Sequence, residues 1–485
     1  MKQSNSLPAV QVLRNAFESL LKSRANRVVL CALCMLCAAA LAGAQTVSTI
    51  YNFAGGTTSG ANPWYVTLVQ GTDGYLYGTT YNGGSKGMGT AFKVSTSGSF
   101  VLLHSFVGGA SDGANPTGGL TLGTDGNFYG TTQQGGSSSQ GVIFKMTTSG
   151  TITILHTFNA GTDGAFPWTA PIEASDGNFY GTTADGKGNN GLVYKITSSG
   201  TFTTIYSFDV THGYHPVAAP VQGVDGYLYI PVAEGGADFC GTVVQLSTAG
   251  VLNNYYSFNC EPDGNYPVGS LVQASNGSFY STTQDGGTNG EGTVYQITTG
   301  MVETVLHSFG ATVGDGEYPS AGMLLATDGN YYGSAAEGGT YDDGTLFNTT
   351  TGGSYNQLYS FNNSANLMEE SPLSPPIQDT NGTLYGVTEF GGTKDEGTVY
   401  SLNMGLSSFV NSPLFSGKEG SSVLLLGDHL TGTSSVTFNG VSAKYVVHND
   451  THMTATVPSG ATSGWIKVTT PSGAIKSRKV FTVEK

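Results

Sequence analysis

The octapeptide DGNFYGTT occurs twice in this chain of 485 residues, at positions 125–132 and again at 176–183. Related octapeptides begin at Asp73, Asp225, Asn276, Asp328 and Asn381, which makes seven copies at steps of 49 to 53 residues. A catalytic motif has no need to be repeated, whereas a structural unit does. A period of this length indicates a repeat architecture.

Two further motifs keep the same period. GTVYQI at 292–297 and LHSF at 103–106 both have relatives in every copy. Together with the YGTT segment and a less regular stretch before each Asp-Gly, they give four short strands per repeat, A to D. Four strands of this size match one propeller blade. We therefore predict an all-β fold in which residues 45–404 form a seven-bladed β-propeller with four-stranded blades.

The two ends of the repeat region are complementary. Residues 46–53 read as a strand D with no A, B or C before it, and the last copy, ending at 397–402, has no strand D after it. We expect the N-terminal strand to complete the seventh blade and close the ring; the alternative is an open solenoid. We also expect the small residues Gly130 and Gly181 to let neighbouring blades approach closely.

The loops on the two faces of such a propeller differ in this chain. The A–B turns are short and use Asp-Gly or Asn-Gly, and the C–D turns of the first four repeats are equally short, whereas the B–C and D–A loops carry most of the acids. We predict a binding surface for a cation or a sugar on the acidic face. The alternative is that Asp-Gly turns only shape the loops and the acids keep the surface hydrated. The candidate binding residues are Asp112, Asp163, Asp263, Asp315, Asp185, Asp285, Glu337 and Asp395.

Motifs for metal binding or catalysis are missing from the sequence. No calcium loop of the D-x-[DN]-x-[DN]-G type occurs, so a Ca²⁺ site would have to be built from several loops, and no other cofactor is expected. The histidines of the LHSF motif (His104, His156, His307), replaced elsewhere by Tyr206, Tyr256, Tyr359 and Asn52, should stay apart on different blades and serve packing. Trp64, Trp168 and Trp465 are too few for an obvious sugar-stacking platform.

The first 44 residues differ from the rest. Basic residues precede an apolar run at 28–42, and Ala42-Gly43-Ala44 follows. This pattern predicts a signal peptide, residues 1–44, cleaved near Ala44, and therefore a secreted, periplasmic or cell-surface protein with no stable membrane span. The alternative is an uncleaved signal anchor, although the apolar run is shorter than the roughly 20 residues of a spanning helix.

Two cysteines remain after the leader, and they fall in the fourth repeat. Cys240 begins strand C and Cys260 follows strand D, so the hairpin about Gly250 places them opposite one another. Export permits a disulfide. We predict the pair Cys240–Cys260.

Charge narrows the choice of partner. Residues 45–404 contain six lysines, no arginine and 28 Asp or Glu residues. Nucleic acids are bound through Lys and Arg, so a nucleic-acid partner is not expected. An extracellular polysaccharide or protein is the expected partner.

Residues 405–485 lack the repeat motifs. Their alternating apolar and polar residues and their turn signals predict a small immunoglobulin-like β-sandwich. The segment resembles the IPT/TIG family through Gly417 and Gly420, residues 423–427 (VLLLG), 436–440 (VTFNG), 454–458 (TATVP) and 464–468 (GWIKV). That resemblance implies an extracellular interaction or spacer module rather than a catalyst.

The seven repeats resemble the GloVer (Gloeo/Verruco) tandem-repeat family of secreted bacterial proteins. The resemblance rests on D-G-x-[LF]-Y-G-T-T followed by G-G and by G-T-V-[FY]-K. It implies no established activity. Kelch propellers share the repeat length and the Gly-Gly pairs.

These observations favour an exported, non-catalytic binding protein that recognises a polysaccharide, a protein or a cation through the acidic loops. One alternative is a secreted propeller enzyme, a polysaccharide hydrolase or lyase, which would need paired carboxylates in the central pocket. Another is a structural or adhesive component of the cell surface.

Overall fold

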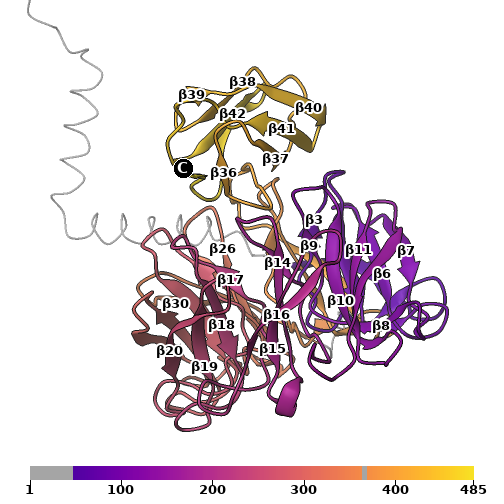
Figure 1. Ribbon diagram of the computed structural model, residues 1–485, viewed down its shortest axis with the longest axis vertical. Coiled ribbons are helices and arrows are strands. Elements are labelled where there is room, and N and C mark those ends of the chain that lie inside the picture. Colours follow the sequence, from indigo (N-terminus) through magenta and orange to yellow (C-terminus); the bar gives the residue numbers. More distant parts are fainter. Residues whose placement is uncertain (1–46, 363–368, 485) are drawn as a thin grey trace, which may run out of the picture. The chain divides into compact units, whose positions relative to one another are not determined.

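Short strands joined by glycine-rich turns make up nearly all of the chain that the structure describes, as its Gly, Thr and Tyr content predicts. The computed structural model describes residues 47–362 and 369–484, and the predicted signal peptide lies outside this range. The described residues are all-β apart from one 3-10 turn, η1 (Lys187–Asn189) (Figure 1). Within them, no helix is long and apolar enough to cross a membrane.

Each repeat forms its own antiparallel sheet, which we number 1 to 7 in chain order. Six of the seven sheets have four strands and sheet 2 has five. Sheet 1 contains β3 (Val69–Gln70), β4 (Leu76–Thr80), β6 (Thr90–Val94) and β7 (Phe100–Ser105). Sheet 2 contains β8 (Gly113–Pro116), β9 (Thr121–Leu122), β10 (Phe128–Gly135), β11 (Val142–Met146) and β12 (Ile152–Thr157). Sheet 3 contains β13 (Ile172–Glu173), β14 (Phe179–Thr183), β15 (Leu192–Ile196) and β16 (Phe202–Ser207).

The later repeats follow the same order. Sheet 4 contains β17 (Val221–Gln222), β18 (Leu228–Val232), β19 (Thr242–Leu246) and β20 (Leu252–Ser257). Sheet 5 contains β21 (Val272–Gln273), β22 (Phe279–Thr283), β23 (Thr293–Ile297) and β24 (Glu303–Ser308). Sheet 6 contains β26 (Leu324–Leu325), β27 (Tyr331–Ala335), β29 (Thr345–Thr349) and β30 (Tyr355–Ser360). Two-stranded pairs join β2 (Gly60–Ala61) to β5 (Asn82–Gly83), β25 (Gly316–Glu317) to β28 (Glu337–Gly338), and β31 (Glu369–Glu370) to β34 (Phe390–Gly391).

Sheet 7 takes its fourth strand from the beginning of the described chain. Its own repeat supplies β32 (Ile377–Gln378), β33 (Leu384–Thr388) and β35 (Thr398–Leu402), and β1 (Val47–Asn52) pairs antiparallel with β35. The register runs from Val47 opposite Leu402 to Asn52 opposite Thr398. The first strand therefore occupies the place that the missing strand D leaves open.

The repeated octapeptide holds successive sheets together. The Tyr77 ring of sheet 1 stacks on Phe128 of sheet 2, with ring centroids 4.1 Å apart, and Tyr129 of sheet 2 stacks on Phe179 of sheet 3 at 3.8 Å. Where the next sheet has leucine instead, tyrosine and leucine lie in one buried cluster; these pairs are Tyr180 with Leu228, Tyr332 with Leu384, and Tyr385 with Leu76. The last of these pairs joins sheet 7 to sheet 1.

The same tyrosines tie each sheet to its own A–B turn. Tyr129 Oη donates a hydrogen bond of 2.9 Å to Asp125 Oδ2, four residues earlier, and Tyr180 repeats this bond with Asp176 at 2.7 Å. A buried hydroxyl needs such a partner. The Asp and Tyr of the octapeptide are thus one structural device.

The glycine that follows this tyrosine has a different role from the one expected. A Cβ atom on Gly130 would lie 2.5 Å from Phe144 Cζ, and one on Gly181 would lie 2.3 Å from the Tyr194 hydroxyl. Both aromatic residues belong to strand C of the same sheet. The glycine therefore makes room for an aromatic ring within its own sheet, rather than for close approach of the neighbouring one.

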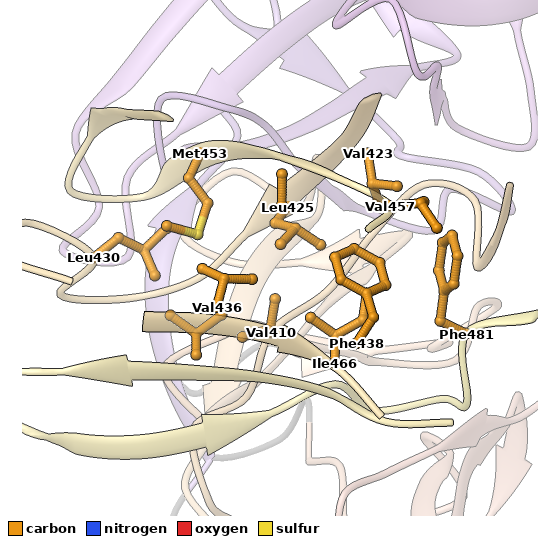
Figure 2. Close-up of a cluster of buried hydrophobic side chains, with 12 residues drawn as sticks. Val410, Val423, Leu425, Leu430, Val436, Phe438, Met453, Val457, Ile466 and Phe481 are labelled. Carbon is orange, nitrogen blue, oxygen red and sulfur yellow. The ribbon is translucent and has the colours of Figure 1, made fainter. Parts of the chain in front are cut away.

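The C-terminal segment folds as a sandwich of two sheets with its own core. One sheet contains β37 (Ser422–Leu426), β40 (Tyr445–Asn449) and β41 (His452–Thr456); the other contains β38 (Ser435–Phe438), β39 (Val441–Ser442), β42 (Ile466–Thr470) and β43 (Gly473–Lys476). A parallel pair, β36 (Ser416–Lys418) with β44 (Thr482–Glu484), completes it. Figure 2 shows Leu425, Val436, Phe438 and Ile466 pointing toward one another between these strands, and all four are buried.

A disulfide joins Cys240 and Cys260, as the predicted hairpin requires. The two cysteines are separated by 20 residues, and their Cα atoms lie 5.3 Å apart. Between them, β19 and β20 pair antiparallel, with Thr242 opposite Ser257. The bond clips the outer strand of sheet 4 to the strand beside it.

Replacing both cysteines by alanine should lower the free energy of unfolding by about 3 kcal/mol, because the unfolded chain loses a cross-link closing a loop of this size. Urea unfolding followed by circular dichroism would measure the change. Wild-type protein kept reduced is the matched control and should show the same loss. Equal unfolding midpoints for the oxidised wild type and the variant would contradict this prediction.

Candidate functional site

A cavity of about 400 Å³ is lined by residues from all seven repeats. Its wall is mainly apolar, with a few hydroxyl groups such as those of Ser270 and Ser374. One wall residue from each repeat, in chain order, is Thr67, Leu120, Ala170, Ala219, Leu271, Met323 and Leu373. The segments that carry strand A therefore face one common space.

Aromatic side chains gather at this cavity. We call Trp64, Tyr65, Tyr81 and Trp168 the aromatic cluster. The Trp64 ring centroid lies 5.2 Å from that of Trp168, 5.3 Å from Tyr65 and 5.0 Å from Tyr81. Tyr65 and Trp168 line the cavity directly, together with Tyr266. Two tryptophans 104 positions apart in the sequence thus form one partly exposed surface.

The two tryptophans occupy the same position of their D–A loops, and the repeat between them has the smaller residue Thr117 there. Trp64 and Trp168 each follow the proline of a D–A loop, whereas the loop of the intervening repeat continues with Thr117 and Gly118. Gly118 has φ +73°, and a Cβ there would lie 2.5 Å from the carbonyl oxygen of Trp168. The sequence signal for this surface is the pair of Pro-Trp dipeptides at equivalent positions of two repeats. The expectation that three tryptophans are too few for a stacking platform overlooked it.

The residue before this proline has a left-handed backbone in every repeat. Its φ lies between 51° and 59° at Asn62, Asn115, Phe166, His215, Tyr266, Tyr318 and Ser371. Left-handed backbone is unusual for residues other than glycine. The shared turn brings Tyr266 into the wall of the cavity and places His215 among the loop acids.

Three of the predicted binding acids occupy one equivalent position in their B–C loops. Each pairs, backbone to backbone, with the residue two positions after a predicted D–A acid: Asp185 with Ala165, Asp285 with Asn265, and Glu337 with Glu317. The carboxylates differ in setting. His215 bridges Asp185 and Glu234, with nitrogen-to-oxygen distances of 3.4 and 3.1 Å. Burial first, and the charge of Glu291 second, raise the pKa of Asp285.

The predicted acid Asp395 shapes its own loop. Its backbone has φ +58°, and its carboxylate accepts a hydrogen bond of 2.9 Å from the Gly391 N–H. Asp342 repeats this bond one repeat earlier, to the N–H of Gly338. Asp395 therefore acts as a loop cap on an exposed surface.

The four predicted D–A acids face their own repeats. His104, His156 and His307 contact Asp112, Asp163 and Asp315 at 3.1 to 3.2 Å, and the Tyr256 hydroxyl donates to Asp263. Backbone N–H groups of Val107 and Gly113 also bond Asp112. Burial alone raises the pKa of Asp112, but the hydrogen bonds from His104 and the backbone outweigh it and leave the pKa below its usual value.

These contacts explain the histidines of the LHSF motif. They stay apart, as expected, but each serves as the partner of an acid in the following loop rather than as a packing residue alone. In β1 the equivalent residue is Tyr51, not Asn52, and its hydroxyl lies 3.2 Å from Ser59, which takes the place of the acid. The paired acids are positioning residues of the loop, and the proposed site does not include them.

Asp263 has a second carboxylate beside it. Glu303 is the first residue of β24, where the equivalent residues Phe100, Phe202 and Tyr355 stack on the aromatic or histidine ring of the preceding sheet. Glu303 Oε1 is buried and has no hydrogen-bond partner among the described residues. Burial first, and Asp263 second, raise the pKa of Glu303 to about 8.

Chelation of a metal by the predicted acids finds no support in their placement. Within residues 47–362 and 369–484, the one group of three ligand atoms within 4.8 Å of one another belongs to Asp428, His429 and Asp450. These residues lie in the C-terminal sandwich. A calcium ion in the B–C loops stays an expectation that rests on the sequence alone.

Glu303→Gln should stabilise the protein, and more so as the pH rises. The pKa of Glu303 is higher in the folded state than its ordinary value of 4.5, so the protonated side chain is tolerated in the fold. The contribution of Glu303 to the free energy of unfolding is fully present below about pH 4.5 and is lost as the pH rises through about 8, where the buried side chain becomes charged and glutamine does not. Thermal unfolding at pH 5 and pH 9 would measure the difference from wild type. Glu419→Gln, on an exposed residue, is the control. An equal effect of Glu303→Gln at both pH values would contradict the prediction.

Comparisons with known proteins support the repeat and say little about the ligand. A search of curated proteins gave no match. Among solved structures, the extracellular domain of a B. thetaiotaomicron protein described as a one-component system is 11% identical, with a TM-score of 0.46; the match covers 86% of this chain and 57% of that one. The chain thus spans little more than half of that structure.

Two further structures are similar at the same level. A periplasmic gluconolactonase from Pseudomonas aeruginosa is 15% identical with a TM-score of 0.43, over 68% of this chain and 97% of that one. A Bacteroides uniformis protein assigned as a 6-phosphogluconolactonase is 18% identical with a TM-score of 0.43, over 67% and 95%. Scores this low carry no argument about activity.

The family models match most of the chain. The Gloeobacter/Verrucomicrobia repeat matches residues 39–190 and 168–374, and the IPT/TIG domain matches residues 407–482. Both agree with the motifs read from the sequence. The chain belongs to the Gloeobacter/Verrucomicrobia repeat family and ends in an IPT/TIG domain.

Proposed function

We propose that this is an exported, non-catalytic protein that binds an uncharged or positively charged saccharide at the mouth of a closed seven-bladed propeller. The aromatic cluster at the shared cavity is the observation that carries the proposal. Export rests on the leader pattern of residues 1–44.

Three contacts support the closed ring. β1 pairs with β35, Tyr385 of sheet 7 lies in one buried cluster with Leu76 of sheet 1, and Gln70 of sheet 1 donates a hydrogen bond of 2.8 Å to Thr380 of sheet 7. A cavity that takes wall residues from every repeat is the central channel of such a ring.

The chemistry of the mouth suits a sugar. The C–H face of a sugar ring is apolar and stacks on an aromatic ring, whereas its hydroxyl groups need donors and acceptors at the edge. Trp64, Tyr65 and Trp168 offer the rings. Burial first, and the charge of Glu234 second, raise the pKa of the wall residue Tyr266, so the Glu234 carboxylate, which shares His215 with Asp185, is an acceptor close to the cavity. An anionic sugar is disfavoured because residues 45–404 contain many acids and no arginine.

Catalysis on a polysaccharide is not favoured by this cavity. Its lining, within the described residues, includes no Asp, Glu or His side chain. A glycoside hydrolase of the usual kind needs two carboxylates flanking the scissile bond. Tyr65 and Tyr266 are the titratable groups in the lining, and burial raises the pKa of both.

Trp64→Ala and Trp168→Ala should each weaken saccharide binding roughly tenfold or more, because each removes one of the two tryptophan rings of the aromatic cluster. A glycan array, with and without Ca²⁺, would identify the ligand, and tryptophan fluorescence would then measure the affinity. Trp465→Phe, in the C-terminal sandwich, removes the remaining tryptophan and is the matched control, with unchanged affinity expected.

Two outcomes would contradict the proposal. Unchanged affinity in Trp64→Ala and Trp168→Ala would remove the aromatic cluster from the site. Release of new reducing ends from a bound glycan would show turnover and would contradict the non-catalytic assignment.

A further inference from the structure

The only arginine after residue 27 lies beside a cavity. Arg478 is followed by Lys479, and both precede β44 in the C-terminal sandwich. They line a second cavity, of about 280 Å³, whose other walls come from sheets 1 and 2 and from the sandwich; these wall residues include Gln70, Thr121, Asn411, Ser412 and Leu426. The remaining basic residues of the sandwich do not line it.

Direct contacts hold the two sides of this cavity together. Residues 47–485 form one compact unit. Leu424 and Leu426 of β37 belong to the buried cluster that contains Tyr77 and Phe128. Asn449 Nδ2 and Thr451 Oγ1 both donate hydrogen bonds to the carbonyl oxygen of Thr72, at 3.1 and 3.0 Å. The cavity is therefore a defined space and not a gap between loosely joined parts.

The two cations have no counter-charge there. Arg478 Nε is buried without a hydrogen-bond partner among the described residues, and neither cation forms an ion pair among them. No carboxylate lines the cavity in this part of the chain. The guanidinium carbon lies 5.7 Å from the centre of the Phe409 ring, which is an attractive but weak contact.

The electrostatics agree with this geometry. Burial lowers the pKa of Arg478 to about 10. Burial first, and the charge of Arg478 second, lower the pKa of Lys479 to about 8. Both residues keep some contact with solvent, but two like charges held side by side and partly out of water are unfavourable unless an opposite charge joins them.

We propose that Arg478 and Lys479 form a binding site for a small oxyanion, such as phosphate, sulfate or a carboxylate. The planar fork of arginine can bond two oxygens of such an anion at once, and lysine adds a compact charge beside it. Asn411 lines the same cavity with an unpaired Oδ1, and a half-turn of its amide presents Nδ2 as a further donor. A bound anion would join the C-terminal sandwich to the first two sheets.

Thermal unfolding of the purified chain at constant ionic strength would test this. Sodium phosphate, sulfate and acetate are titrated separately against chloride. The proposal expects a saturable rise in Tm of about 3 °C for at least one of them, because the anion binds only the folded state. The anion whose rise in Tm is half complete at the lowest concentration shows whether the site prefers a tetrahedral oxyanion or a carboxylate. Arg478→Met should lose the saturable part, and Lys444→Met, on an exposed lysine, should keep it.

A non-specific effect has a different form. Sulfate and phosphate stabilise most proteins in proportion to their concentration. A linear rise that is equal in wild type and Arg478→Met would overturn the proposal, as would no rise with any of the three anions. If Arg478→Met fails to fold, titration calorimetry of wild type and Lys479→Met with phosphate decides, with at least a tenfold weaker affinity expected for Lys479→Met.

Discussion

The contact on which this structure depends is the packing of one octapeptide tyrosine against the next repeat. Tyr77 stacks on Phe128, and Tyr129 on Phe179, while the hydroxyl of Tyr129 bonds the aspartate of its own turn. One side chain thus fixes both the turn within a sheet and the spacing between sheets. Because the contact recurs in every repeat, each sheet is placed by its neighbour, and all strand A segments come to face one cavity.

This arrangement separates structural acids from exposed ones. Asp112 and Asp315 are buried against the histidine of the preceding strand, so they hold the D–A loop in place. Asp185 and Glu234, in contrast, belong to the B–C loops, are partly exposed and both contact His215. The Trp168 loop is held in the same way by Asp163 and His156, whereas the Trp64 loop has the Tyr51–Ser59 contact instead. In the proposed site the aromatic surface of these two loops, more than the acids, contacts the ligand.

The sequence predicted the regular part of this molecule well, because each repeated residue has the same surroundings. Counting the copies of DGNFYGTT predicts the seven sheets, and the missing strand D predicts the partner of β1. The disulfide follows from hairpin geometry. The site is harder to predict because it depends on residues that differ between repeats. Trp64 and Trp168 come from D–A loops 104 positions apart and meet only in the folded repeats, and the cavity beside Arg478 takes walls from sheets that are distant in the sequence.

The central claim is that the repeats close into a ring through the first strand, which sets the cavity and the mouth above it. A disulfide between Ser48→Cys and Ser401→Cys tests it most directly, since these residues lie opposite one another in the β1–β35 pair. The account predicts rapid cross-linking under mild oxidation in the native protein, seen by mass spectrometry of the digest, and no cross-link when Ser48→Cys is combined with Ser247→Cys. Absence of the Ser48–Ser401 cross-link in the folded protein would contradict ring closure by this strand.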